Sequence, residues 1–432
     1  MGIEKFIPFI ESKCPTAQFQ ILVSDFAGHR LAMDGSGVCY AYYSKAYYQA
    51  VQQMKVEELL NETGEPDYDK VLNMCRTRLI NGLIKRLFEN QILPVTVSDG
   101  PAPPEKRVKV DREAVRTQLD LVVANLQHKI RTGDNVALNI TNLKKKASQR
   151  NTYAHPIIRE MHSLFFNLGL PTLQAPQEAD PVCGFLSRYD YCMGVIGRDT
   201  DILIHGARFL LTKFNWLPVG STVNVLSRVH IMYGLGLNED QLTELAILAG
   251  NDYNDHMPGM AITTAFKSYN HHKSLDMMAN LRNSQGLPIY DFTCLRIDVC
   301  RRMFRPYTGA DLGDYLSYQI QNELIIDANK TYQNWTYFTE RGLNVEMFLH
   351  YFRNYPAGAV KWPVATTPSV LESASTAGGG GGERAVAEVP PLPPPAAVVT
   401  PSIPPALTFV SAVNRGAPVA SASGSLVLEG HF

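Results

Sequence analysis

Short apolar runs alternate along the body of the chain with stretches whose apolar positions recur at helical spacing. The runs that read as strands are residues 29–34, 93–99 and 192–197. The stretches with helical spacing include 68–89, 154–168 and 178–189. Strands that alternate with helices predict an α/β fold, with a mostly parallel central sheet flanked by helices.

Acidic residues stand where these strands end and where helices begin or end. Seven share such positions: Asp34, Asp99, Asp199 and Asp201 after strands, Glu178 and Asp180 at a helix start, and Asp252 after a helical stretch. In open α/β sheets, ligand sites form beyond the carboxyl ends of the strands. Any one acid is more often a turn former or helix cap than a metal ligand. Their joint occurrence favours one shared site.

Seven carboxylates that converge repel one another unless they are protonated or hold cations. Mg²⁺ and Mn²⁺ prefer carboxylate and water oxygens, so we expect two Mg²⁺ ions, for which Mn²⁺ can substitute. Two such ions activate a water molecule and stabilise the leaving oxygen of a phosphodiester. The acids therefore predict metal-dependent phosphodiester hydrolysis.

The composition of the chain limits the kinds of binding surface, cysteine chemistry and cellular location that we expect. Lys and Arg number 40 against 41 Asp and Glu, so any nucleic-acid site must be a local basic patch. The seven cysteines form no Cys-x-x-Cys pair, which disfavours a disulfide framework and a structural zinc. No run reaches about 18 apolar residues, so we expect an intracellular protein without a membrane segment. From residue 357 the chain is rich in Gly, Ala, Ser and Pro, which predicts a disordered tail over 357–432.

The order and spacing of the acids resemble those of the flap endonuclease and XPG-type family of structure-specific 5′ nucleases, over about residues 1–290. The matching stretches are LAMDGSGVCYAYY, VTVSDGPAPPEKR, LQAPQEADPVCG, GRDTDIL and LAGNDYNDHMPGM. The resemblance implies a PIN-like fold in which the seven acids are metal ligands. It also implies a helical arch over 101–155 and a helix-three-turn-helix segment near Gly259.

The resemblance gives roles to further residues. Lys106 stands where the family has a lysine directed at the scissile phosphate. The place of a second basic arch residue is taken by Glu113, and either Arg112 or Arg116 would substitute for it. Tyr40 stands where a tyrosine stacks on a substrate base.

Further nucleic-acid contacts are expected in the arch and at two glycines. The arch contains LKKKASQR, whose basic residues are Lys144, Lys145, Lys146 and Arg150. A charge run is usually a solvated face, but within this family's arch it favours phosphate contacts. Gly2, in the opening MGI, matches the family's first residue.

The helix-three-turn-helix segment departs from the family. Gly259 is present, but Ala261 replaces a second glycine, and Thr263 and Thr264 replace basic residues. Backbone amides bind phosphate closely only where no side chain obstructs, so we expect a weakened grip on duplex.

These patterns predict a nuclease core over 1–290, made of an N part (1–100), the arch (101–155) and an I part (156–290). A helical extension (291–356) and the tail follow. The predicted function is cleavage of flapped or branched DNA at single-strand to duplex junctions in replication, repair or recombination, in the nucleus rather than the cytoplasm. The tail shows no clamp-binding motif. The alternatives are an mRNA-cleaving endoribonuclease of the same fold, favoured by the weakened duplex grip, and a catalytically dead scaffold.

Overall fold

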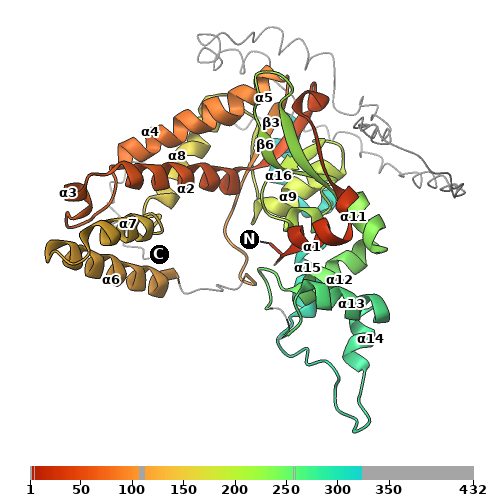
Figure 1. Ribbon diagram of the computed structural model, residues 1–432. Coiled ribbons are helices and arrows are strands. Elements are labelled where there is room, and N and C mark those ends of the chain that lie inside the picture. Colours follow the sequence, from red (N-terminus) through yellow and green to blue (C-terminus); the bar gives the residue numbers. More distant parts are fainter. Residues whose placement is uncertain (1, 4, 107–111, 256, 258, 324–432) are drawn as a thin grey trace, which may run out of the picture. The chain divides into compact units, whose positions relative to one another are not determined.

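A seven-stranded sheet lies at the centre of the part of the chain that the computed structural model describes, residues 2–3, 5–106, 112–255, 257 and 259–323 (Figure 1). Its strands are β1 (Gln18–Leu22), β2 (Arg30–Asp34), β3 (Leu93–Ser98), β4 (Thr172–Gln174), β5 (Gly194–Ile196), β6 (Phe209–Asn215) and β7 (Thr222–Ser227). The order is β1-β7-β6-β5-β2-β3-β4. Neighbours from β6 to β4 pair in parallel, whereas β7 pairs antiparallel with β6 and β1. The predicted mostly parallel sheet is confirmed.

Helices connect and cover these strands. The first eight are α1 (Phe6–Lys13), α2 (Gly35–Gln53), α3 (Val56–Leu59), α4 (Tyr68–Leu79), α5 (Lys85–Glu89), α6 (Arg112–Arg131), α7 (Val136–Ala147) and α8 (Ala154–Asn167). The rest are α9 (Ala179–Arg188), α10 (Asp201–Ile204), α11 (Arg228–Leu235), α12 (Glu239–Ala249), α13 (Ile262–His272), α14 (Leu275–Asn280), α15 (Ile297–Met303) and α16 (Gly313–Glu323). A π-helical stretch, Ile80–Ile84, joins α4 to α5, so the helix predicted over 68–89 is continuous but irregular.

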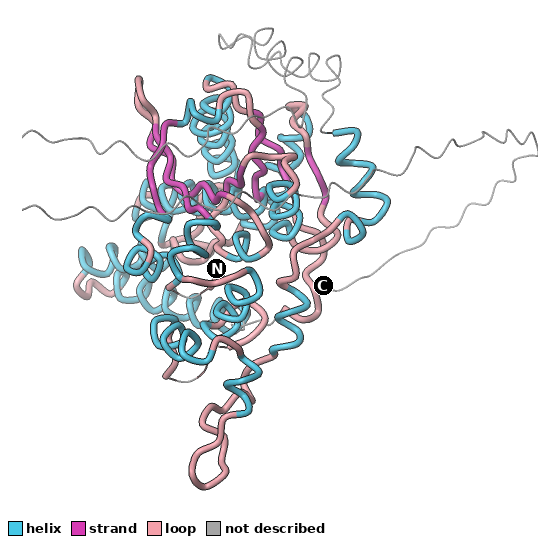
Figure 2. Tube along the Cα trace, turned by 90° about the vertical axis from the view of Figure 1, so that its right-hand side faces the viewer, coloured by secondary structure: helices cyan, strands magenta, loops and turns pink. Residues whose placement is uncertain are grey.

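Alternate side chains along the strands belong to two separate hydrophobic cores. Figure 2 shows the strands with helices around them. Leu31 and Met33 of β2 belong to the core that contains residues of α2, α4, α5 and α8. Ala32, between them, belongs to the core that contains residues of α1, α9, α12 and α13. Successive residues of a strand point to opposite faces, so the sheet is covered by helices on both faces, as a parallel sheet requires.

The chain changes direction across the sheet at β2. From β2 it proceeds to β3 and β4 on one side, and it then returns to β5 on the other side of β2. The carboxyl ends of β2 and β5 therefore flank a topological switch point, where ligands bind in open α/β sheets. Asp34 ends β2 and Asp199 follows β5, so the first and fourth predicted acidic segments meet there.

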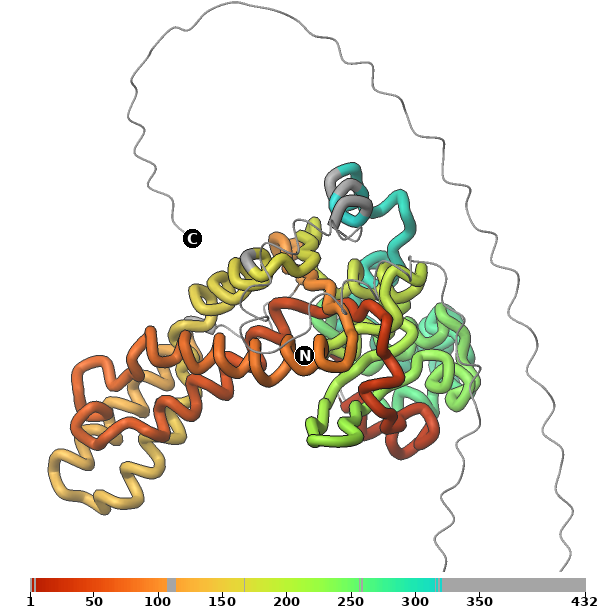
Figure 3. Tube along the Cα trace, turned by 90° about the horizontal axis from the view of Figure 1, so that it is seen from above, coloured from red at the N-terminus to blue at the C-terminus, as the bar shows by residue number. Residues whose placement is uncertain are grey.

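The predicted arch segment contains α6 and α7, which pack against each other between β3 and α8 in the sequence. α7 also packs against α2 and α3, and α2 packs against α4 (Figure 3). The predicted helix-three-turn-helix segment corresponds to α12 and α13, which pack against each other.

Part of the predicted helical extension is described. It contains α15 and α16, and α16 lies beside β4, where the Gln174 N–H donates to Oε1 of Gln319 (3.1 Å). The remainder of the extension, 324–356, and the predicted tail, 357–432, lie outside the described residues. Among the described helices, none is long and apolar enough to cross a membrane. The division into nuclease core, extension and tail stays a prediction.

Candidate active site

The acids after β2 and β5 are buried and fixed by backbone amides. Asp34 is the N-cap of α2, and its Oδ1 accepts a hydrogen bond from the Gly37 N–H (3.0 Å). Asp199 Oδ1 accepts one from the Asp201 N–H (3.0 Å). All three acids are at most 9% exposed. Asp201 Oδ1 is a buried oxygen with no hydrogen-bond partner among the described residues, so this carboxylate can accept a cation.

The start of α9 brings three more acids together. Glu178 is the N-cap residue of α9, and Asp180 lies in its first turn. Asp99, after β3, accepts a hydrogen bond on Oδ1 from the Ala179 N–H (2.8 Å). The N-terminus of α9 carries partial positive charge and unpaired N–H groups, which favours acids there.

Lys106 joins the α9 acids to the segment after α12. Its ammonium pairs with Oε1 of Glu178 and with Oδ2 of Asp252, at 3.3 Å from the latter. The Tyr253 hydroxyl donates to the other oxygen of Glu178 (2.5 Å). Burial alone would lower the pKa of Lys106, but the Glu178 hydrogen bond and the charges of Glu178 and Asp252 outweigh it and raise that pKa. Lys106 therefore stays charged among the acids.

The pKa values of the buried acids show that the carboxylates act on one another. Burial is the main cause that raises the pKa of Asp34 to about 7, and the charges of Asp99 and Asp199 act in the same direction. Burial, followed by the charge of Asp199, also raises the pKa of Asp180 and of Asp201 well above the usual range. The seven acids thus form one electrostatic cluster that lacks enough positive charge.

The donor chemistry of this cluster fits divalent cations. As the side chains lie, no three His, Cys, Asp or Glu residues of the described ranges are grouped closely enough to hold a metal ion. Lys106 supplies a positive charge between two of the acidic segments instead. Oxygen-only donors, mutual repulsion and the unpartnered Asp201 oxygen are what Mg²⁺ or Mn²⁺ binding would use.

Residues 169–252 match the family model of the XPG I-region. This segment of the chain is therefore similar to the I-region of XPG-type nucleases. The chain is 27% identical over 290 residues to flap endonuclease 1 of Theileria parva, which covers 65% of this chain and 53% of that protein. The chain therefore spans about half the length of this curated relative.

Two solved structures of nucleases are also similar. The catalytic core of Rad2 in complex with DNA substrate is 20% identical, with a TM-score of 0.41 over 70% of this chain and 78% of that chain. The Holliday junction-resolving enzyme GEN1, in complex with product DNA and a Mg²⁺ ion, is 15% identical, with a TM-score of 0.43 over 80% of this chain and 77% of that chain.

The XPG I-region contains five of the seven acids. These are Glu178, Asp180, Asp199, Asp201 and Asp252. Asp34, Asp99 and Lys106 come from the chain before it, and the structure brings them to the same place. The ligand roles of the acids and the phosphate-directed role of Lys106 stay predictions.

The predicted nucleic-acid contacts of the arch have different surroundings. Lys144 donates to the Gln52 carbonyl (2.7 Å), while Lys145 is exposed and Lys146 is half-buried. Arg150 donates to the Thr63 carbonyl (2.6 Å) and pairs with Asp120 (2.8 Å). Two of the four basic residues therefore tie the arch to its neighbours, and binding phosphate would require them to exchange partners.

The other predicted contact residues lie on α2, on α6 and in the loop before α13. Tyr40, on α2, is 38% exposed, so part of its ring is open to a base. Arg116 is exposed on α6, whereas the side chain of Arg112 lies outside the described residues. Before α13, Gly259 has a φ of +74°, and a Cβ there would meet nothing within 4 Å. Its backbone is therefore accessible, as a phosphate contact requires.

Gly2 lies against the acidic cluster. With a φ of +80°, it approaches so closely that a Cβ would lie 2.3 Å from Asp199 Oδ1 and 2.6 Å from Thr200 Oγ1. The next residue, Ile3, donates its N–H to Thr200 Oγ1 (3.2 Å). The N-terminus is thus packed onto the Asp199 turn, and contact with nucleic acid stays a prediction.

Two groups that hold the cluster were not predicted from the sequence, Tyr253 and Arg296. Tyr253 directly follows Asp252 in the fifth motif, so the motif itself was a signal for it. Arg296 donates to the Glu105 carbonyl (2.7 Å), next to Lys106, and no motif around it points to the site.

Proposed function

We propose that this chain is a divalent-metal-dependent nuclease that hydrolyses phosphodiester bonds of DNA where a 5′ flap or another single strand meets duplex. The observation that carries this proposal is the clustering of seven carboxylates around one lysine, at the switch point of a sheet in a chain that matches the XPG I-region over residues 169–252. We also propose that the protein acts in DNA replication, repair or recombination, and that it is located in the nucleus.

The seven acids, Asp34, Asp99, Glu178, Asp180, Asp199, Asp201 and Asp252, would hold two Mg²⁺ ions. When bound, these ions supply an activated water and stabilise the charge on the leaving oxygen. The chain itself fixes the acids: backbone N–H groups orient Asp34, Asp99 and Asp199 before any substrate arrives. Groups that are already oriented need no reorganisation at the moment of reaction.

Lys106 would bind the scissile phosphate of the substrate. Its ammonium is paired with both Glu178 and Asp252, and its side chain is about a third exposed. A phosphate oxygen can therefore replace one of these carboxylates as its partner. Tyr253 keeps Glu178 in place during that exchange, because its hydroxyl bonds the second carboxylate oxygen. Tyr40 would stack on a base beside the cut bond, with Arg112 or Arg116 as the second cation on the phosphate.

The test is cleavage of a labelled 5′-flap DNA with Mg²⁺, with Mn²⁺ and with EDTA, by the wild type and by Asp199→Asn. Asn keeps an acceptor for the Asp201 N–H but removes the charge. Asp190→Asn is the matched control. Asp190 is an exposed acid that lies before β5, whereas Asp199 follows β5, and Asp190 pairs with Arg208 and not with the cluster. We expect metal-dependent cutting at the flap base that Asp199→Asn loses and Asp190→Asn keeps. Equal activity in both variants would refute the site.

RNA is the second candidate substrate. The exposed threonines at the start of α13, Thr263 and Thr264, offer no positive charge to duplex backbone. A matched single-stranded RNA belongs in the same assay. Cutting of RNA alone would transfer the proposal to an mRNA-cleaving endoribonuclease, and cutting of neither would favour a scaffold.

A further inference from the structure

A segment beyond the I-region holds the loop that carries Lys106. Arg296, which precedes α15, donates from Nη1 to the backbone carbonyl of Glu105 (2.7 Å) and to that of Tyr253 (3.3 Å). Arg302, on α15, donates to the Glu105 carboxylate (3.0 Å). The residue before Lys106 is therefore bonded twice, once through its backbone and once through its side chain.

The same helix supports the turn that carries Asp252. Asn251 Oδ1 accepts from the Tyr253 N–H (2.8 Å), and Asn254 donates to the Ile247 carbonyl (3.0 Å), so both fully buried amides shape this turn. The buried thiol of Cys300, on α15, contacts Asn254 Oδ1. α15 thus touches both segments whose side chains meet at Lys106.

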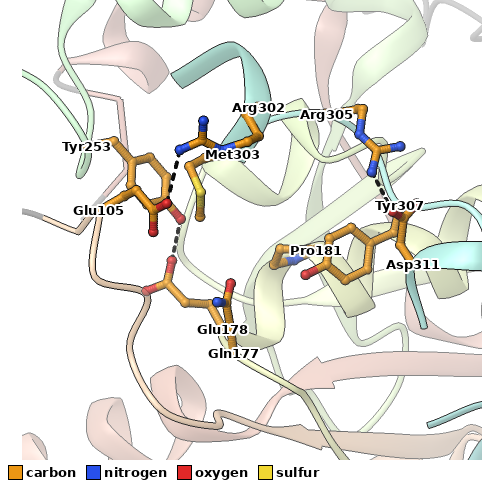
Figure 4. Close-up of a pocket in the computed structure, with 10 residues that line it drawn as sticks. All are labelled: Glu105, Gln177, Glu178, Pro181, Tyr253, Arg302, Met303, Arg305, Tyr307 and Asp311. Carbon is orange, nitrogen blue, oxygen red and sulfur yellow. Dashed lines mark hydrogen bonds and ion pairs between the residues drawn. The ribbon is translucent and has the colours of Figure 1, made fainter. Parts of the chain in front are cut away.

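A pocket of about 270 Å³ separates this helix from Glu178 (Figure 4). In Figure 4, Tyr253 points to Glu178 and Arg302 points to Glu105. Glu178 of the acidic cluster and residues of α15 therefore line the same pocket. A displacement of α15 would change the surroundings of Glu178.

We propose that Arg296 is a positioning residue that sets the distance between the Lys106 loop and the Asp252–Tyr253 turn. This inference rests on the proposed function. The flexible stem of lysine does not fix its ammonium, so the anchoring of its backbone sets the range of positions from which the ammonium can reach both carboxylates. The guanidinium of Arg296 bonds two carbonyls from segments far apart in sequence, and it fixes both relative to each other.

Steady-state cleavage of flap DNA tests the inference, with Arg296→Gln and the conservative Arg296→Lys. Displacement of a reacting group by about 1 Å costs about 100-fold, so we expect kcat to fall by about 10-fold to 100-fold in Arg296→Gln. The KM should change by less than about threefold, because no contact with DNA is removed. Arg305→Gln is the control, since Arg305 lines the same pocket but pairs with Asp311. A loss confined to KM, or an equal loss in the control, would overturn the proposal.

A double-mutant cycle with Lys106→Ala separates positioning from general destabilisation. If Arg296 acts through Lys106, the combined variant loses much less than the product of the two single losses. Multiplicative losses would show that Arg296 acts independently and would contradict the proposal.

Hydrogen exchange gives a readout that needs no activity. We expect faster amide exchange at Ala102, Glu105 and Lys106, and in residues 251–254, of Arg296→Gln, and no change there in Arg305→Gln. If the wild type cuts no nucleic acid, the proposed function fails, while exchange still decides the positioning role. Unchanged exchange in both segments would overturn it.

Discussion

Replacing Asp34 by asparagine should stabilise the metal-free protein by an amount that grows with pH. Burial is the main cause that raises the pKa of Asp34 from 3.8 to about 7. The folded chain therefore holds this proton more tightly than the unfolded chain, and the wild type loses stability as the pH rises from 3.8 through 7. Asparagine carries no charge at any pH, and its Oδ1 can still cap the Gly37 N–H.

The size of the effect follows from the pKa. At about 1.4 kcal/mol per pKa unit, Asp34→Asn should be more stable than the wild type by about 2 kcal/mol at pH 5 and about 4 kcal/mol at pH 8. Urea unfolding in EDTA, followed by circular dichroism between pH 5 and pH 8, measures this difference. Asp190→Asn serves as the exposed control. An advantage of Asp34→Asn that is the same at every pH would refute the reasoning. Added Mg²⁺ at pH 8 should stabilise the wild type more than the variant.

Three further substitutions test the site and the core beside it. Gly2→Ala should lower the unfolding free energy by at least about 1 kcal/mol and reduce cleavage, because its Cβ would collide with Asp199; a fully active, equally stable variant would contradict the packing. Tyr253→Phe should lower kcat by about tenfold in the flap assay, since Glu178 loses one of its two partners; an unchanged kcat would show that Lys106 alone orients it. Burial lowers the pKa of His205 from 6.5 to about 3, so the unfolded chain takes up this proton first as the pH falls. Between pH 6.5 and pH 5, the unfolding free energy of the wild type, measured with urea, should therefore fall by about 2 kcal/mol more than that of His205→Phe. Equal falls in both proteins would show that another group causes the loss of stability in acid.

The strands that carry acids could be predicted because they are nearly all apolar. β2, β3 and β5 lie inside the sheet, buried on both faces, and the predicted runs that end at or run into Asp34, Asp99 and Asp199 contain them. The apolar pattern did not predict β1, β6 or β7. β1 (QFQIL) and the second half of β6 (FLLTKFN) alternate between partly buried and exposed residues, so they form no continuous apolar run.

Motif spacing predicted which acids gather, but not what holds them. The bonds of Lys106 to Glu178 and of Arg296 to Glu105 join segments that only the packing of α9 and α15 brings together. Such contacts leave no periodicity in the sequence. The basic run of the arch shows the same limit, since composition cannot say that Lys144 and Arg150 would turn to the carbonyls of Gln52 and Thr63.

The placement of α6 and α7 between two neighbouring parallel strands has a consequence for how such proteins diversify. β3 and β4 pair directly, and α8 alone is enough to cross from one to the other. The α6–α7 pair is therefore an insertion into a crossover that is already complete. Lengthening, shortening or exchanging such an insertion leaves the strand register untouched, and long insertions cost little loop-closure entropy. A new α6–α7 pair can thus be grafted without rebuilding the sheet that carries the acids.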